Sequence, residues 1–171
     1  MINGMVEMAT MSGNAANRER ADFAELLLNC YEAFRLQMER KNTMLRVNIP
    51  PGLPFVYAEA EQLMRVPVNL LSNAVNATQN GEIILEASAE NNYITVNIGD
   101  NGEGISPEFL PHVFERGVSG KGGKGYGLSI CKTIVEAHGG EISIESEPGG
   151  GTVVTFSIPV YGGQNEARNN E

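Results

Sequence analysis

A glycine-dense run that leads directly into an apolar segment constrains the fold of this chain more than any other feature. Glycine occupies six of the eleven positions from Gly117 to Gly127, and the apolar run LSICKTIVEA follows at once. Glycine costs backbone order, so a run this dense is either a flexible linker or a loop that closes around something. A well-patterned helix begins where the run ends, which favours the loop. The N–H groups at such a helix end attract anions, and Lys121 and Lys124 add positive charge, so the sequence predicts a phosphate site.

Two familiar nucleotide-binding motifs fit this run poorly. Gly120, Gly122 and Gly125 match the spacing of a dinucleotide fingerprint, but the preceding FERGVS does not read as the strand that this motif requires. A P-loop would place Lys-Ser or Lys-Thr after Gly125, where this chain has Tyr126. The expectation of a phosphate site therefore rests on the glycine loop and the helix end themselves.

The charge distribution favours a small anionic ligand over nucleic acid. The formal net charge is −9 at pH 7, which argues against non-specific nucleic-acid binding. The stretch from Arg116 to Val135 is an exception, because it holds four basic residues and no acidic one. An acidic chain with one basic, glycine-rich loop is expected to hold an anionic small molecule at that loop.

The cysteines and the hydropathy pattern predict a cytoplasmic location. Cys30 and Cys131 are the only cysteines, and each lies in a helical apolar pattern, so we expect both to be reduced core residues. No apolar run approaches the ~18 residues of a membrane span, and the N-terminus lacks the pattern of a signal peptide. We expect no membrane contact by this part of the protein, although a longer parent chain could be membrane-anchored.

The order of periodic segments predicts an α/β fold with a mixed sheet. A helix is expected from a cap at Asp22 to about residue 42, followed by a strand at 44–49, a short extended piece at 55–58 and a helix at 59–78. Alternating residues predict hairpins over 83–98 and 142–158, separated by a brief helix beginning at 106–108 and a longer one over 125–138. Pro67 predicts a kink in the 59–78 helix, or a regular part that begins only near Arg65.

Three asparagines share one face of the helix expected at 59–78. Asn69, Asn73 and Asn76 lie within about 60° of one another on a helical wheel. A solvent-exposed face is the ordinary explanation, yet asparagine is a poor helix former and exposed faces usually carry lysine and glutamate. Amide oxygens suit a hard cation, and Mg²⁺ takes few protein ligands beside its waters and phosphates.

A second glycine loop follows the first hairpin and starts at Asp100. Its sequence DNGEGISPEF lacks the acidic spacing of a calcium loop. A carboxylate at a strand end, followed by Gly102 and Gly104, could accept a hydrogen bond from an amino group such as that of adenine. One nucleotide would then have its base at Asp100, its metal at Asn73 and its phosphates at the Gly125 helix.

These segments together resemble the catalytic and ATP-binding domain of sensor histidine kinases, in the superfamily that includes gyrase-type and chaperone ATPases. The resemblance covers about residues 22–160 and rests on NLLSNAVNAT, DNGEGI, FLPHVFERG, GGKGYGLSI and GGGT, in the family's order. It implies the Bergerat fold, a two-layer α/β sandwich in which a mixed sheet packs on three helices. It also implies ATP and Mg²⁺ as cofactors.

The resemblance assigns roles by position. Asn69 and Asn73 would be catalytic, with Asn73 as the Mg²⁺ ligand and Asn69 near the γ-phosphate. Asp100 would bind adenine, with Thr152 near the base, and Phe114 would anchor a lid over the phosphates. The nucleotide-contacting residues implied in this way are Asn73, Asn76, Asp100, Gly102, Gly104, Arg116, Lys121, Gly123, Lys124, Gly125, Tyr126, Gly127, Leu128 and Thr152.

The chain departs from the family pattern at several positions. Asn76 and Ala77 replace a frequent Lys-Tyr pair, which removes a phosphate contact and an adenine-stacking ring; Lys121, Lys124 or Arg116 could supply the charge. No phosphoacceptor helix is recognisable. Neither His112 nor His138 precedes an acidic residue in a helix as an acceptor does, so we interpret both as structural or capping residues.

The implied organisation is a catalytic domain cut from a longer kinase. Residues 1–14 resemble the end of a dimerisation helix, 15–160 the ATP-binding catalytic domain, and 161–171 a disordered polar tail. The implied reaction transfers the ATP γ-phosphate to a histidine on a dimerisation domain, and then to a response regulator, with a homodimeric parent. An ATPase or clamp, an anti-sigma-like serine kinase and a non-catalytic nucleotide sensor are the alternatives. The first two would usually carry an acid where this chain has Asn69, an amide that cannot take a proton from water.

Overall fold

Seven strands and three α-helices make up the part of the chain described by this computed structural model, residues 17–116 and 127–162. The helices are α2 (Phe23–Arg40), α3 (Ala60–Ala77) and α4 (Leu128–Ala137), and a 3-10 helix, η2, covers Leu110–His112. The strands are β1 (Glu19–Ala21), β2 (Met44–Asn48), β3 (Val56–Ala58), β4 (Glu82–Glu90), β5 (Tyr93–Asp100), β6 (Ile142–Glu147) and β7 (Gly151–Pro159).

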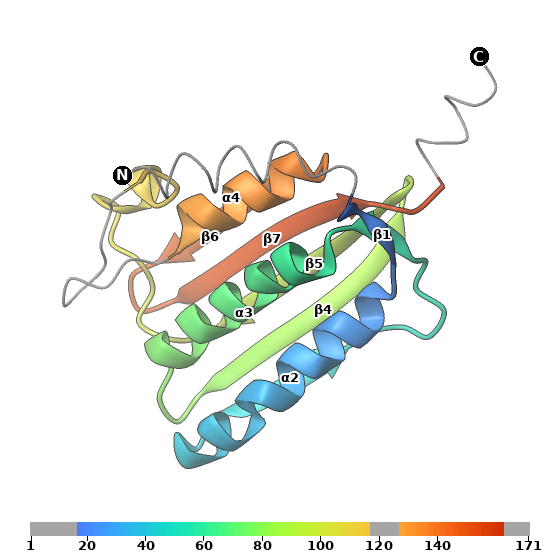
Figure 1. Ribbon diagram of the computed structural model, residues 1–171. Coiled ribbons are helices and arrows are strands. Elements are labelled where there is room, and N and C mark those ends of the chain that lie inside the picture. The colour runs from blue at the N-terminus through green and yellow to red at the C-terminus, as the bar shows by residue number, and fades with distance from the viewer. Residues whose placement is uncertain (1–16, 117–126, 163–171) are drawn as a thin grey trace.

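Five of these strands form one mixed sheet whose order is β2-β4-β5-β7-β6. β2 runs parallel to β4, and the other three pairs are antiparallel, as expected of two hairpins brought together. The three helices cover one face of this sheet, so the fold has two layers (Figure 1). The predicted α/β sandwich with a mixed sheet on three helices is confirmed.

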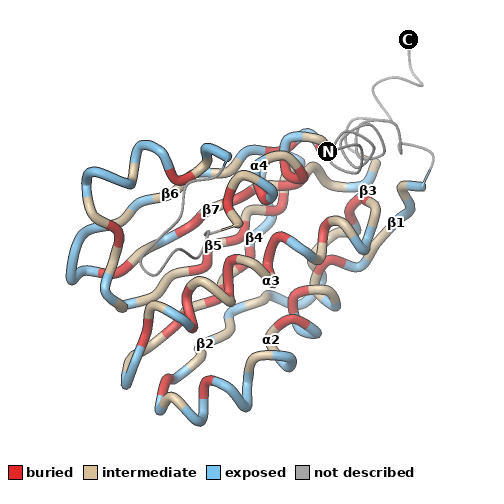
Figure 2. The backbone as a smooth tube through the Cα atoms, turned by 60° about the vertical axis from the view of Figure 1, so that its left-hand side comes forward, coloured by how far each residue is buried: buried red, intermediate tan, exposed pale blue. Residues whose placement is uncertain are grey.

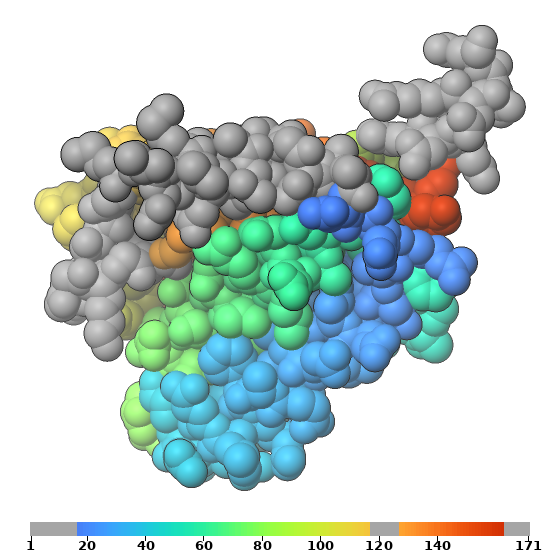
Figure 3. Space-filling view, viewed as in Figure 1, coloured from blue at the N-terminus to red at the C-terminus, as the bar shows by residue number. Residues whose placement is uncertain are grey.

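The core lies between the helices and the sheet because both elements are amphipathic. Three alternating residues are buried in β4, from Ile83 to Ala87, and three in β5, from Ile94 to Ile98, which is the period that places one face of a strand against helices. Buried segments line the facing sides of the two layers (Figure 2). On the helical side, α2 and α3 form a continuous packed surface (Figure 3). The buried face of α3 consists of Leu63, Val66, Pro67, Leu70, Leu71, Ala74 and Val75.

The helix ends show how local chemistry sets the element boundaries. The Asp22 carboxylate accepts a hydrogen bond from the backbone N–H of Glu25 (3.2 Å), which confirms the predicted cap of α2. α3 is continuous from Ala60 through Pro67, so the expectation that its regular part begins near Arg65 is wrong. Proline removes one helix donor, but burial of Pro67 and its neighbours against the core stabilises the turn that it weakens.

Two elements differ from the sequence expectations. The brief helix expected to begin at 106–108 begins later, as η2 at Leu110. It follows a turn in which the Ser106 carbonyl accepts from the N–H groups of Phe109 and Leu110. β1 was not anticipated, because three residues are too few for a period to show. It pairs antiparallel with β3, and the Arg20 guanidinium lies 4.6 Å from the centre of the Phe55 ring.

Cys30 and Cys131 are buried and form no disulfide, as predicted. Among the described residues, no helix has the length and apolar character needed to cross a bilayer. The expectations for residues 1–14, for 163–171 and for most of the glycine loop, residues 117–126, lie outside the described part of the chain.

Candidate functional site

A pocket that is open to solvent lies between α3, the end of β5 and the loop after it, the start of α4, β6 and β7; its empty space is about 480 Å³ when the solvent at its mouth is included. Its polar lining comes from three segments far apart in the sequence, represented by Asn73, Asp100 and Thr152. Its other walls are aliphatic, and no aromatic side chain of the described residues lines it. The full lining is Leu70, Asn73, Ala74, Ala77, Ile98, Asp100, Glu103, Gly104, Ile105, Leu128, Ile144, Thr152 and Val154.

Asp100 ends β5 and lies opposite Thr152 of β7 in the sheet register. Burial raises the pKa of its carboxyl group, and nearby Glu103 raises it further, while hydrogen bonds from the backbone N–H groups of Gly102 and Thr152 lower it. The Gly102 N–H lies 2.9 Å from Oδ1. The carboxylate is therefore held in a fixed orientation at the pocket wall, with acceptor capacity left for a donor from a ligand.

The glycines of the DNGEGI loop are required by close backbone approach. A Cβ on Gly102 would lie 2.7 Å from the carbonyl carbon of Ala77, at the end of α3. Gly104 has φ +74°, and a Cβ there would lie 2.8 Å from the carbonyl carbon of Glu147. The loop is thus wedged between α3 and the turn that joins β6 to β7, and this positions Asp100.

A hydroxyl network fixes the opposite wall of the pocket. Ser146 Oγ accepts from the Ile105 N–H (2.8 Å), donates to the Gly151 carbonyl (2.9 Å) and lies 2.8 Å from Thr152 Oγ1. Since the single Ser146 proton goes to Gly151, Thr152 donates to Ser146 and keeps its own lone pairs as acceptors. No sequence pattern indicated that Ser146 organises this wall.

The asparagine face of α3 divides between two environments. Asn73 lines the pocket, whereas Asn69, one turn earlier, lies against Gly127 and Cys131 of α4. Asn76 is exposed and is not among the lining residues. The pattern therefore brings two of the three predicted amides to the site region.

The other predicted site residues fall into three groups. Gly104, Leu128 and Thr152 line the pocket together with Asn73 and Asp100, while Gly102 supports the loop from behind. Arg116 is exposed and lies outside the lining, at the edge of the described residues. Five predicted residues lie outside the described residues: Lys121, Gly123, Lys124, Gly125 and Tyr126.

Sequence reasoning missed Glu103 and the aliphatic walls. Ile98, Ile144 and Val154 follow the same alternating pattern as the rest of the core, so nothing in the sequence marks them as pocket residues. Glu103 could have been noticed as a second acid next to Asp100.

The two histidines have structural surroundings. His138 is 8% exposed; its Nε2 accepts from the Glu59 N–H (3.3 Å) at the start of α3, and its Nδ1–H donates to the Ile134 carbonyl (2.8 Å). Burial lowers the pKa of this imidazole, which keeps it neutral. His112 is on the surface, 2.8 Å from the Glu115 carboxylate. The capping interpretation is confirmed for His138, which joins α4 to α3.

The donor set near the pocket suits a cation that takes most of its ligands from elsewhere. In the described part of the chain, no cluster of three or more His, Cys, Asp or Glu side chains could hold a metal ion. Asn73 offers an amide oxygen at the pocket wall. Mg²⁺ fits such a site, since it commonly keeps several waters and binds substrate phosphates with only one or two protein ligands.

Comparison with known proteins gives consistent matches. The model of the family described as histidine kinase-, DNA gyrase B-, and HSP90-like ATPases matches residues 58–162. The adaptive-response sensory kinase SasA of Synechococcus elongatus is 34% identical over 170 residues, which cover 94% of this chain and 44% of SasA. The chain therefore spans less than half the length of that relative.

Solved structures show the same architecture. The nucleotide-free catalytic domain of histidine kinase ThkA superposes with a TM-score of 0.76 at 28% identity, covering 84% of this chain and 95% of that domain. ThkA in complex with the response regulator protein TrrA matches with a TM-score of 0.71, covering 93% of this chain and 49% of the ThkA chain. At 24% identity, the second match shows the fold alone.

Proposed function

The chain belongs to the family of histidine kinase-, DNA gyrase B- and HSP90-like ATPases, and from this premise we propose that residues 15–160 are the ATP-binding catalytic domain of a sensor histidine kinase. One observation carries the proposal. Asn73, Asp100, Thr152 and the first residue of α4 line a single pocket, although they are spread over about half of the sequence. A polar group for a base, an amide for a cation and a helix N-terminus for phosphates are thereby brought within the span of one nucleotide.

Asp100 is the proposed adenine ligand. Its remaining acceptor capacity matches the exocyclic amino group of adenine, and a guanine carbonyl at the same place would meet the carboxylate with like partial charge. The aliphatic side chains of Ile98, Ile105 and Val154 offer apolar walls for the faces of the base. Thr152 keeps hydroxyl lone pairs for a second donor.

The N-terminus of α4 is the proposed phosphate end of the site. Gly127 caps this helix with φ +67°, and the first helical N–H groups after it have no acceptor within the helix. Such groups, together with the helix dipole, stabilise an anion. Leu128 lines the pocket, so this helix end adjoins the cavity that holds the base.

Asn73 is the proposed protein ligand of Mg²⁺, and Asn69 the amide beside the reacting phosphate. When bound there, Mg²⁺ would supply positive charge that offsets the charge of the phosphates. The chain itself orients the nucleotide, and it supplies no carboxylate at position 69 that could activate water for hydrolysis. This amide favours phosphotransfer over ATPase activity.

The proposed acceptor is a histidine on a dimerisation domain, to which we assign residues 1–14. An imidazole nitrogen forms the new N–P bond, the bond from phosphorus to the bridging oxygen breaks, and ADP leaves. The proposed parent is a homodimer that acts in the cytoplasm and passes the phosphate to a response regulator. The 34% identity to the adaptive-response sensory kinase SasA supports a signalling role of this kind.

Calorimetric titration with the non-hydrolysable analogue AMPPNP, with and without Mg²⁺, tests the proposal. We expect binding that Mg²⁺ strengthens, and weaker binding of the matching guanine nucleotide. Asp100→Asn should reduce the preference for adenine, whereas Glu145→Gln, which removes a charge from exposed β6, should leave it unchanged. Absence of AMPPNP binding in both conditions would contradict the assignment.

Activity assays separate the alternatives. Phosphate transfer from ATP to a supplied dimerisation hairpin supports the kinase. ATP hydrolysis without any histidine substrate would indicate an ATPase, and nucleotide binding with neither reaction would indicate a nucleotide sensor.

A further inference from the structure

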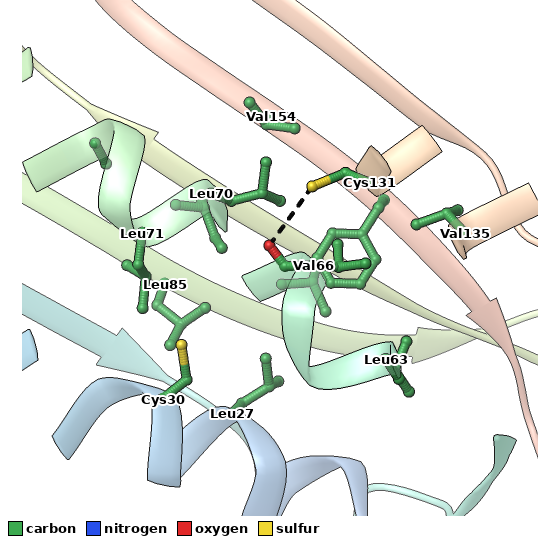
Figure 4. Packing of buried hydrophobic residues seen from close by; sticks show 14 of the residues in the cluster. Leu27, Cys30, Leu63, Val66, Leu70, Leu71, Leu85, Cys131, Val135 and Val154 are labelled. Atoms are coloured by element: carbon green, nitrogen blue, oxygen red, sulfur yellow. Dashed lines mark hydrogen bonds between the residues drawn. The ribbon is translucent and has the colours of Figure 1, made fainter. Parts of the chain in front are cut away.

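The two cysteines are equally buried but have different surroundings. Cys30 of α2 and Cys131 of α4 are both 0% exposed. Figure 4 shows Cys30 near Leu27 and Leu85 of the apolar core, whereas the Cys131 sulfur faces the carbonyl oxygen of Val66 in α3. Only Cys131 therefore links the helix that begins at the phosphate end of the site to the helix that carries the asparagines.

Cys131 makes two hydrogen bonds with α3. Its Sγ–H donates to the Val66 carbonyl (3.9 Å), and its sulfur accepts from Asn69 Nδ2 (3.7 Å). A thiol has a single proton, and a carbonyl can only accept. With that proton committed to Val66, the sulfur can face only the NH₂ side of the Asn69 carboxamide. The amide oxygen is consequently turned away from Cys131.

The chemistry of the buried thiol keeps this arrangement in place. Burial raises the pKa of Cys131 to about 11, so the group remains S–H at neutral pH. As S–H, the group can donate to the Val66 carbonyl and accept from the Asn69 NH₂ group at the same time.

Gly127 approaches the same amide nitrogen as Cys131 does. A Cβ on Gly127 would lie 3.2 Å from Asn69 Nδ2 and 3.3 Å from its Cγ, and its φ of +67° also favours glycine. Gly127 and Cys131 lie one turn apart, joined by the hydrogen bond from the Cys131 N–H to the Gly127 carbonyl (3.2 Å). The first turn of α4 thus packs against the Asn69 carboxamide with both a glycine backbone and a thiol.

We propose that Cys131 is a positioning residue, which orients the Asn69 carboxamide so that its oxygen is presented to the nucleotide. The inference rests on the proposed function for the role of Asn69, but the orientation itself does not. The turn from Gly127 to Cys131 connects the end of the glycine loop to the Asn69 carboxamide, so a movement of one is expected to move the other.

Four variants test this, with Cys30 as the matched control. Cys131→Ala removes both hydrogen bonds, and Cys131→Ser keeps a donor and an acceptor at the same place. Cys30→Ala and Cys30→Ser make the same changes at an equally buried site in α2. Three quantities are measured for each full chain: the Asn69 side-chain amide resonances by ¹⁵N NMR, the Kd for AMPPNP with Mg²⁺, and the Tm.

The expected pattern separates positioning from stability. Cys131→Ala should shift the Asn69 amide resonances and raise the Kd about fivefold, the usual worth of one hydrogen bond. Cys131→Ser should bind AMPPNP more tightly than Cys131→Ala does. Its Tm should nevertheless be no higher than that of Cys131→Ala, because a hydroxyl in an apolar core is destabilising. Both Cys30 variants should lower the Tm and leave the resonances and the Kd within about twofold of the parent chain.

Two results would overturn the inference: unmoved Asn69 resonances in Cys131→Ala, or affinities that simply follow the Tm across the four variants. If the parent chain fails to bind AMPPNP while the Asn69 resonances still move in Cys131→Ala alone, the orientation by Cys131 stands and the nucleotide role of Asn69 falls.

Discussion

Replacing Gly102 with alanine tests how the DNGEGI loop is held against α3. The φ of Gly102 is not in the left-handed region, so alanine fits the backbone and stiffens the unfolded chain, a gain of about 0.4–1 kcal/mol. Its Cβ, however, would lie 2.7 Å from the Ala77 carbonyl carbon. An ordinary contact begins near 3.4 Å, so the loop must retreat by at least about 0.7 Å from α3.

That retreat acts on two hydrogen bonds. The Glu103 N–H donates to the Ala77 carbonyl at 3.2 Å and would be stretched beyond hydrogen-bonding distance, a loss of about 1 kcal/mol. Overpacking destabilises the folded state by about 1–3 kcal/mol more. After the gain from the stiffer unfolded chain is subtracted, we expect the free energy of unfolding to fall by about 2 kcal/mol and the Tm by roughly 4–8 °C. The Gly102 N–H that orients Asp100 moves as well, so the Kd for AMPPNP should rise at least about fivefold.

Thermal melts and calorimetry measure both effects, with Gly140→Ala as the control. A Cβ on Gly140 would lie 2.8 Å from the Ser157 carbonyl carbon, also without a positive φ, but this glycine is not among the pocket residues. Gly140→Ala should therefore lower the Tm and spare affinity. If Gly102→Ala keeps the Tm and the affinity of the parent chain, the wedged position of the loop is refuted.

Three further predictions concern the metal, the pocket wall and pH. Asn73→Ala should remove most of the Mg²⁺-dependent gain in AMPPNP affinity with little change in far-UV circular dichroism; an undiminished gain would reject Asn73 as the metal ligand. Ser146→Ala leaves the Ile105 N–H and the Gly151 carbonyl without their partner, so urea unfolding should show a loss of about 2–3 kcal/mol. Folding lowers the pKa of His138, so the unfolded chain binds more protons than the folded chain does. The free energy of unfolding should therefore keep its full value above pH ~6.5 and decrease as the pH drops below that. His138→Gln should flatten that part of the pH profile of stability, and an identical profile would contradict the buried neutral imidazole.

Much of the fold could be predicted from the sequence because its signals are local. Alternation in β4 and β5 marks one buried face per strand, and the Asp22 cap places the start of α2. The kinase-like domain was predicted from motifs whose residues and order can be read directly in the sequence. β1 and the turn after Ser106 were not predicted correctly, because three-residue elements carry no period and depend on the segments that they pack against.

The sequence by itself determined which chemical groups this protein has: an amide face on one helix, a carboxylate at a strand end, and a glycine loop before a helix. Only the tertiary structure decided how they meet. It placed Asn73 in the pocket and Asn69 against Cys131, left Asn76 in solvent, and showed that Ser146 holds Thr152. The physical reason is that the helical period determines only the direction in which each side chain leaves the helix axis. A pocket depends on the distances between segments, and these are set by the packing of the whole core.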